Sequence, residues 1–217
     1  MGKIIGCATH KGGNGKSVTS ISLAAGLARE GNSCLLIDLD AQAHSGMGLG
    51  IELEYNDLNI ADCLSSGNVN IQDIIVQTSV ENLHLVPSNI RLSATAENLY
   101  TKIHKEERLS AALEPIKGSY DYIVVDNPPT LGTLLWNTIH AADSLIIPCS
   151  MGARSADGLN DLLAVIDEVK RGFENYWILL TMVDRRNKAT NRAVETTLKN
   201  FKKKILKSEI PRQEGFQ

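Results

Sequence analysis

Apolar runs of strand length recur along the chain and alternate with segments of helical periodicity. Most of these runs are continuously apolar, as expected for parallel strands that are covered on both faces. The predicted strands are residues 3–8, 34–38, 83–87, 122–126, 144–149 and 177–182. The predicted helices are residues 17–29, 60–64, 93–100, 106–116, 132–141, 155–171 and 190–203. This alternation predicts an α/β fold with a doubly wound, mostly parallel sheet flanked by helices, whose ligands bind at the carboxyl ends of the strands.

The length and composition of the chain indicate one domain with a sizeable core. Its 217 residues are 43% hydrophobic, and no linker, repeat or low-complexity tract divides them, so we expect a single domain over residues 1–217. No apolar run is long enough to span a membrane, and no secretory or transit segment precedes the first predicted strand. The four cysteines are scattered, which fits a reducing cytoplasm and predicts no cysteine metal site.

The segment between the first predicted strand and the first predicted helix is rich in glycine and lysine. It reads Lys11-Gly12-Gly13-Asn14-Gly15-Lys16-Ser17 and is followed by Val18. Such a loop wraps phosphates, because glycine lets backbone N–H groups approach an anion and the helix N-terminus is positive. Lys16 can reach the β- and γ-phosphates, and the Ser17 hydroxyl can bind Mg²⁺. His10 stands where the strict phosphate-loop pattern has glycine, and Lys11 is an additional lysine. A plain turn with a solvated Lys11 is the alternative; the pattern favours a nucleoside triphosphate site.

Carboxylates end two of the other predicted strands. Asp126 follows four apolar residues, which is the Walker B pattern of a carboxylate that binds Mg²⁺. Asp38 and Asp40 end the second strand, where they can orient water on the metal or beside the γ-phosphate; alternatively, Asp38 caps the strand and Asp40 starts a turn. The glycine-rich stretch through Gly50 predicts a mobile switch. The expected metal site combines Ser17, Asp126 and Asp40.

These three segments together resemble the deviant Walker A ATPases of the ParA/MinD superfamily, and most closely the ParA/Soj partition proteins, over nearly the whole chain. Residues 11–17 resemble the signature-lysine loop, residues 38–42 the Asp-x-Asp-Pro-Gln segment, and residues 126–129 the Asp-x-Pro-Pro segment. Four residues depart from the family pattern, and we expect them to tune rate or partner choice: Asn14, Ala41, Ala43 and His44. His44 is either a proton donor near the phosphates or a side chain on the switch surface.

The resemblance implies a homodimer that encloses ATP and Mg²⁺. Lys11 would cross to the γ-phosphate of the partner's ATP, Lys16 would serve its own nucleotide, and Asp40 would serve the attacking water. The implied nucleotide-binding residues are Gly12, Gly13, Asn14, Gly15, Lys16, Ser17 and Val18, with Met182, Asp184 and Pro211 near the adenine. The resemblance also implies weak intrinsic ATP hydrolysis that a ParB-like activator protein stimulates.

Basic side chains are concentrated near the end of the sequence. Residues 185–207 hold nine basic residues and one acidic residue, so this segment carries +8 in a chain of net charge −3. A charged stripe is often a plain solvated helix face, but the excess of cations favours contact with phosphates of double-stranded DNA, without sequence preference. Arg186 and Arg212 match positions where partition ATPases carry DNA-contacting arginines. The predicted DNA-binding residues are Arg186, Lys188, Arg192, Lys199, Lys203 and Arg212.

The resemblance implies ATP-driven partition of plasmid or chromosomal DNA by a cytoplasmic, nucleoid-associated protein. Two alternatives are a ParA-like ATPase that positions a protein cargo and a MinD-like division regulator that cycles on membranes. The latter needs a C-terminal amphipathic helix, which residues 208–217 do not contain, so we expect no membrane partner. Family members usually continue through a final helix; a natural short form or a truncated chain would explain the end at Gln217, and truncation would remove the argument against membranes.

Two further classes of protein fit this sequence less well. Reductases that resemble nitrogenase iron protein need cysteines shortly after the second switch, and none lies between Asp126 and Ala141. A scaffold that binds nucleotide without hydrolysing it is disfavoured because Lys11, Lys16 and Asp40 are all retained with Asp126.

Overall fold

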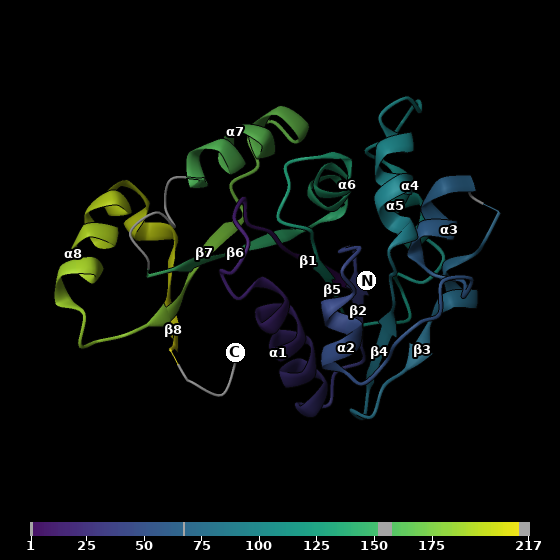
Figure 1. The fold of residues 1–217 in the computed structure, drawn as a ribbon, viewed down its shortest axis with the longest axis horizontal. Coiled ribbons are helices and arrows are strands. Elements are labelled where there is room, and N and C mark those ends of the chain that lie inside the picture. Colours follow the sequence, from purple (N-terminus) through teal and green to yellow (C-terminus); the bar gives the residue numbers. More distant parts are fainter. Residues whose placement is uncertain (1, 67, 152–157, 213–217) are drawn as a thin grey trace.

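The computed structural model describes residues 2–66, 68–151 and 158–212, and in this part of the chain it contains one eight-stranded sheet (Figure 1). The strand order is β3-β4-β2-β5-β1-β6-β7-β8. β3 and β4 are antiparallel, and the other neighbours are parallel. The strands are β1 (Lys3–Cys7), β2 (Cys34–Asp38), β3 (Val76–Gln77), β4 (Leu83–Val86), β5 (Tyr122–Asp126), β6 (Ser144–Ser150), β7 (Tyr176–Val183) and β8 (Ile205–Pro211).

Helices cover both faces of this sheet, as the doubly wound prediction requires. They are α1 (Lys16–Arg29), α2 (His44–Gly48), α3 (Ile60–Ser66), α4 (Arg91–Leu99), α5 (Arg108–Leu113), α6 (Thr133–Ala141), α7 (Leu159–Val169) and α8 (Lys188–Thr197), with 3₁₀ turns η1 (Ile71–Ile74) and η2 (Lys199–Lys204). Alternate strand residues face opposite layers. In β2, Cys34 and Leu36 pack with Ala24 of α1, whereas Leu35 and Ile37 belong to the larger core on the other face. Of the helices described here, none is long and apolar enough to cross a membrane.

Most helices and strands lie at the residues that the hydrophobic pattern predicted, and the differences have local causes. The six predicted strands are confirmed, but β3 and β8 were not predicted. β3 has two residues, and β8 is an edge strand of the sequence Ile-Leu-Lys-Ser-Glu-Ile-Pro with several exposed side chains, so it lacks the apolar signal of a covered strand.

Two helix predictions differ in extent from the structure, and one stretch contains a helix that was not predicted. The predicted helix over 190–203 is wrong in extent, because α8 ends at Thr197 and the chain continues as a 3₁₀ turn before it enters β8. The stretch through Gly50 that was predicted to be a mobile switch includes the short helix α2. α7 covers Leu159–Val169 of the predicted 155–171, and residues 155–157 lie outside the described part of the chain.

The register of the central strands brings the candidate residues to one edge of the sheet. Asp126 at the end of β5 pairs with Cys7 at the end of β1 and with Asp38 at the end of β2. The glycine-rich loop leaves β1 at this edge, and α1 runs back along the sheet from it (Figure 1). The carboxyl ends of three adjacent strands therefore surround the start of α1.

Candidate nucleotide site

The loop between β1 and α1 has the backbone shape of an anion cradle. Gly13 and Gly15 have φ values of 76° and 75°, which favour glycine over residues with a side chain. A Cβ atom on Gly12 or Gly13 would meet no heavy atom within 4 Å, so open space lies beside this backbone. α1 starts without a side-chain cap or an acidic residue in its first turn. Its first N–H groups and its positive dipole end are thus directed to the loop, as phosphate binding requires.

Asn14 anchors this loop to the neighbouring strands. Its side-chain amide donates to Thr9 Oγ1 at 3.0 Å and accepts from the Ser150 hydroxyl at 2.9 Å. The Thr181 hydroxyl donates to the Asn14 backbone oxygen at 2.9 Å. Asn14 is buried. The sequence identified Asn14 as a nucleotide-binding residue of the loop and as a departure from the family pattern, and the structure shows that it also joins the loop to β6 and β7.

Lys16 and Asp126 form the centre of the site. The Lys16 Nζ atom lies 2.8 Å from Asp126 Oδ1, and the two side chains are only 7% and 0% exposed. The Ser17 hydroxyl lies 3.5 Å from the same Nζ atom. The structure therefore brings together the three side chains that the sequence assigned to phosphate and Mg²⁺. Val18 follows on the exposed side of α1.

Two serines that were not predicted from the sequence also donate to Asp126. The Ser20 hydroxyl donates to Oδ1 at 3.0 Å, and the Ser45 hydroxyl donates to Oδ2 at 2.8 Å. Ser20 follows Lys16 by four residues on a helix, so helical spacing could have indicated it. Ser45 carried no such signal, because its position depends on how α2 lies at the ends of β2 and β5.

Asp38 and Asp40 have different roles at the end of β2. Asp38 is fully buried and accepts backbone N–H groups of Asp40, Ser45 and Gly46 at 2.9, 3.0 and 3.2 Å. Burial, followed by the charge of Asp126, raises the pKa of Asp38 to about 7. Asp40 is also buried, and its carboxylate accepts the Gln42 N–H at 3.0 Å. Asp40 therefore starts a turn, which was one of the two readings of the sequence, and Asp38 holds the start of α2.

The donor set fits a magnesium ion that shares its ligands with a nucleotide. No group of three or more His, Cys, Asp or Glu side chains that could hold a metal occurs in the described ranges. Ser17 and Asp126 offer one hydroxyl and one carboxylate, 3.5 and 2.8 Å from Lys16 Nζ. Mg²⁺ is commonly bound by one or two carboxylates, water and substrate phosphates, so this incomplete set suits Mg²⁺ with ATP and does not suit a metal held by protein alone.

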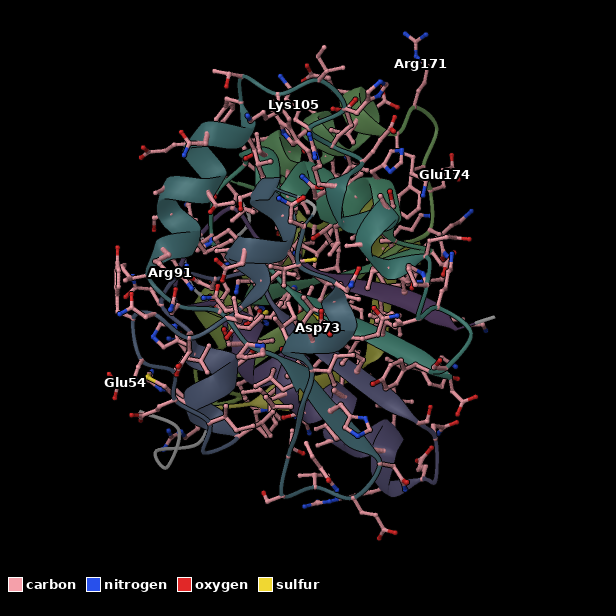
Figure 2. All side chains as sticks on the ribbon, turned by 90° about the vertical axis from the view of Figure 1, so that its right-hand side faces the viewer. Glu54, Asp73, Arg91, Lys105, Arg171 and Glu174 are labelled. Atoms are coloured by element: carbon pink, nitrogen blue, oxygen red, sulfur yellow. The ribbon has the colours of Figure 1, made fainter. Side chains whose placement is uncertain are left out.

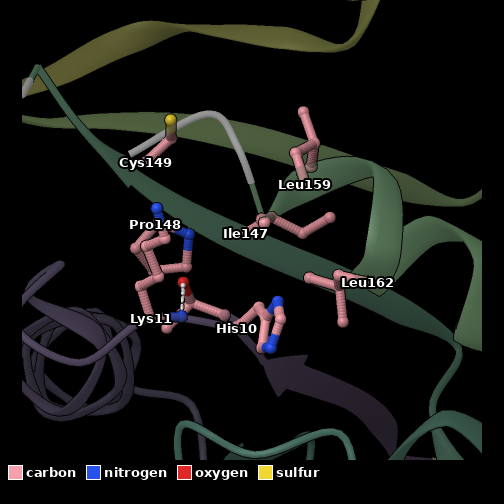
Figure 3. Close-up of a pocket in the computed structure, with 9 residues that line it drawn as sticks. His10, Lys11, Ile147, Pro148, Cys149, Leu159 and Leu162 are labelled. Atoms are coloured by element: carbon pink, nitrogen blue, oxygen red, sulfur yellow. Dashed lines mark hydrogen bonds between the residues drawn. The ribbon is translucent and has the colours of Figure 1, made fainter. Parts of the chain in front are cut away.

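His10 and Lys11 lie at a small cavity between the loop and α7 (Figure 3). Its apolar wall comes from Ile147, Pro148 and Leu162. The Lys11 N–H donates to Thr9 Oγ1 at 3.4 Å. His10 Nδ1 lies 3.4 Å from Asp161 Oδ2, without the geometry of a hydrogen bond. The residue at the strict glycine position therefore packs against α7. His44, the other unusual histidine, is exposed at the start of α2, as expected for the switch surface.

The predicted adenine residues come together at the ends of β7 and β8. Val183 is the register partner of Pro211, and Met182 is 42% exposed with a φ of 53°. Asp184 accepts two bonds of 2.9 Å from the Arg186 guanidinium. These bonds lower the pKa of Asp184 to about 2. The sequence assigned Asp184 to adenine and Arg186 to DNA, but the structure joins them in one ion pair.

Exposed basic side chains occupy the end of the sheet that carries α8 and β8. Arg192, Lys199, Lys203 and Arg212 are exposed, and the side chain of Lys188 lies outside the described part. Other cations of the segment have acidic or aromatic neighbours. Arg185 pairs with Glu209 at 2.5 Å, and Lys204 Nζ lies 4.8 Å from the Tyr176 ring centroid. Glu209 and Asp184 flank the basic segment in sequence, so a count of charges within the segment did not include them.

Comparison with known proteins agrees with this geometry. Residues 2–179 match the family model described as an AAA domain. The chain is 39% identical to the sporulation initiation inhibitor protein Soj of Bacillus subtilis, over 98% of this chain and 85% of that protein. It is 37% identical to the chromosome partitioning protein ParA of Myxococcus xanthus, over 98% of this chain and 76% of that protein.

A solved structure extends the agreement to the fold. The structure described as cobyrinic acid a,c-diamide synthase from Mycobacterium smegmatis, with a bound ATP analogue and magnesium, superposes with a TM-score of 0.90. It is 28% identical and covers 99% of this chain and 88% of that one. The glycine-rich loop, the Lys16–Asp126 pair and these similarities all indicate the same family. The chain belongs to the ParA/Soj family of deviant Walker A ATPases.

Proposed function

We propose that this chain is an ATP-hydrolysing partition switch that binds ATP with Mg²⁺, closes into a homodimer, and then binds double-stranded DNA without sequence preference. One observation carries the proposal: Lys16, Ser17 and Asp126 meet beneath a glycine cradle at the ends of adjacent strands. The relative from Myxococcus xanthus is named a chromosome partitioning protein, and its similarity covers 98% of this chain. The function of the relative and the geometry of the site support the same assignment.

The buried ion pair supports nucleotide binding. Lys16 and Asp126 neutralise each other in a nearly dry site. A phosphate that binds Lys16 would draw this lysine away from Asp126. The Asp126 carboxylate would then keep its two serine donors and could bind a cation. Phosphate binding and Mg²⁺ binding therefore favour each other. Ser17 and Asp126 would hold Mg²⁺, which when bound would supply positive charge to offset the negative charge that develops on the phosphates during hydrolysis.

Hydrolysis needs groups that act only at the γ-phosphate. Asp40, buried in its turn at the end of β2, is the group we assign to the attacking water. Lys11 stands at the entry of the loop, from which it would reach the γ-phosphate of the partner's ATP in the dimer. Because Lys11 would act in trans, intrinsic activity should be weak, and we infer that a ParB-like protein stimulates it.

The exposed cations on α8, η2 and after β8 support DNA binding. Arg192, Lys199, Lys203 and Arg212 are exposed, as backbone phosphate contacts require. Such contacts would place the protein on the nucleoid in the cytoplasm. A protein cargo remains the alternative within the same switch mechanism, and a membrane cycle of the MinD type is the alternative outcome of the experiment below.

Mass measurement and co-sedimentation test the proposal. With a non-hydrolysable ATP analogue and Mg²⁺, light scattering should give twice the monomer mass, and with ADP the monomer mass. The analogue-bound dimer should sediment with unrelated DNA fragments equally well and should not sediment with anionic liposomes. A monomer in saturating analogue would contradict the nucleotide-sandwich dimer. Sedimentation with liposomes but not DNA would favour the membrane cycle.

A further inference from the structure

Ser45 bonds to both carboxylates at the ends of β2 and β5. Its hydroxyl donates to Asp126 Oδ2 at 2.8 Å, and its backbone N–H donates to Asp38 Oδ2 at 3.0 Å. All three residues are 0% exposed. Asp38 and Asp126 are register partners on adjacent strands, so their like charges repel in a site without water screening. One residue of α2 therefore supplies a donor to each member of this pair.

The bonds to Asp126 are divided unequally between its two oxygens. Oδ1 accepts from Lys16 Nζ and from the Ser20 hydroxyl, whose single proton the Lys16 backbone oxygen also attracts at 3.0 Å. Oδ2 accepts from Ser45, which leaves it one further lone pair among these bonds. The direction of that lone pair depends on the rotation of the carboxylate about its terminal torsion. Ser45 of α2 restrains this rotation through Oδ2, whereas the donors on α1 bond to Oδ1.

We propose that Ser45 is a positioning residue for Asp126: its hydroxyl fixes the carboxylate so that the remaining lone pair of Oδ2 is presented to Mg²⁺. The inference rests on the proposed function, because it assumes that Mg²⁺ binds here with ATP. Partners that orient a metal ligand typically change metal affinity about 10- to 100-fold when they are removed. The same hydrogen bond links α2 directly to Asp126 and, through Asp126, to the Mg²⁺ that it would bind.

The test measures how nucleotide affinity depends on Mg²⁺, using a fluorescent non-hydrolysable ATP analogue. Ser45→Ala should raise the Mg²⁺ concentration for half-maximal analogue binding about 10-fold, while the affinity in EDTA stays within about twofold of the wild type. Ser45→Thr keeps the hydroxyl, so it should retain the wild-type Mg²⁺ midpoint within about threefold even where its added methyl group lowers Tm. The matched control is Thr133→Val, which removes a buried hydroxyl that donates to the Ala96 carbonyl on α4.

The possible outcomes separate positioning from a structural role. An unchanged Mg²⁺ midpoint in Ser45→Ala would overturn the proposal, and so would an equal loss of affinity with and without Mg²⁺. A midpoint that follows Tm across the three variants would also overturn it, because the hydroxyl would then matter only for packing. Wild-type protein whose analogue binding ignores Mg²⁺ would contradict the proposed function itself, and this result is seen before any variant is compared.

Discussion

The nucleotide site and the basic C-terminal region both depend on charge, but they hold their charged side chains in opposite ways. At the nucleotide site, Lys16 and Asp126 are 7% and 0% exposed and bonded to each other. In the C-terminal region, Arg185 and Arg186 are 84% and 89% exposed, although each is also paired with an acid. Breaking a buried pair leaves an uncompensated charge, whereas an exposed pair contributes little because water screens it.

Two aspartates show the same contrast. Burial and the neighbouring Asp126 raise the pKa of Asp38 to about 7, whereas the bonds from Arg186 lower the pKa of Asp184 to about 2. An aspartate side chain therefore favours its neutral form at the nucleotide site and its charged form in the C-terminal region. The nucleotide site holds charge for chemistry at one place, and the C-terminal region spreads charge over a surface that a long polyanion can contact.

The largest expected effect comes from breaking the buried pair. Lys16→Ala should abolish nucleotide binding and lower the free energy of unfolding by about 3–5 kcal/mol, because Asp126 stays buried without its cation. The double variant Lys16→Ala/Asp126→Asn should regain most of this stability and still not bind nucleotide. Chemical denaturation and fluorescent-nucleotide titration measure the two effects. A single variant with wild-type affinity would refute the assignment of the phosphate loop.

Lys11 tests whether both lysines of the loop serve the same nucleotide. Lys11→Ala should leave ATP affinity within about threefold of the wild type, because Lys16 holds the phosphates of its own subunit. It should remove hydrolysis and ATP-dependent dimerisation, since the partner's γ-phosphate loses its cation. Phosphate release and light scattering measure these effects. Normal turnover would exclude Lys11 from the mechanism.

The surface charges should act additively and weakly by comparison. The triple variant Arg192→Ala/Lys199→Ala/Lys203→Ala should weaken binding to unrelated DNA sequences equally, by about 10-fold or more, and lower the slope of log affinity against log salt by up to about 2.7. The matched control, Arg29→Ala/Lys102→Ala/Arg171→Ala, removes the same charge from exposed sites on other elements; Arg171 extends from the surface in Figure 2. Equal losses in both variants would mean that net charge alone matters. A loss on one sequence only would contradict contact with the DNA backbone.

The last prediction concerns pH. In the nucleotide-free protein, the Asp38 carboxyl should titrate near pH 7 and that of Asp184 near pH 2, as followed by ¹³C NMR of the side-chain carboxyls. A raised carboxyl pKa in the folded state disfavours the ionised form. The contribution of Asp38 to stability therefore falls as pH rises from about 4 to about 7 and is constant above that range. Midpoints near 4 for both residues would remove this contrast between the two regions.

The pattern of the sequence was sufficient for the parts of the fold whose residues are covered on both faces. Continuous apolar runs predicted six of the eight strands in the described part of the chain, and helical periodicity predicted α1 within one residue. The pattern did not predict β8, because this edge strand carries Lys and Glu and lacks a continuous apolar run. It also failed for α2, where glycines and small residues give no periodicity and the N–H groups of Ser45 and Gly46 are held by Asp38.

The chain by itself determined the glycine cradle, the lysine that follows it and the carboxylate that ends β5, because these depend on local backbone freedom and on short spacings. Only the tertiary structure decided which groups from distant segments form hydrogen bonds or ion pairs with one another. The bridge of Ser45 between Asp38 and Asp126 joins segments far apart in sequence, and so does the anchoring of Asn14 by Ser150 and Thr181. Such contacts depend on strand order and register, which no single segment encodes.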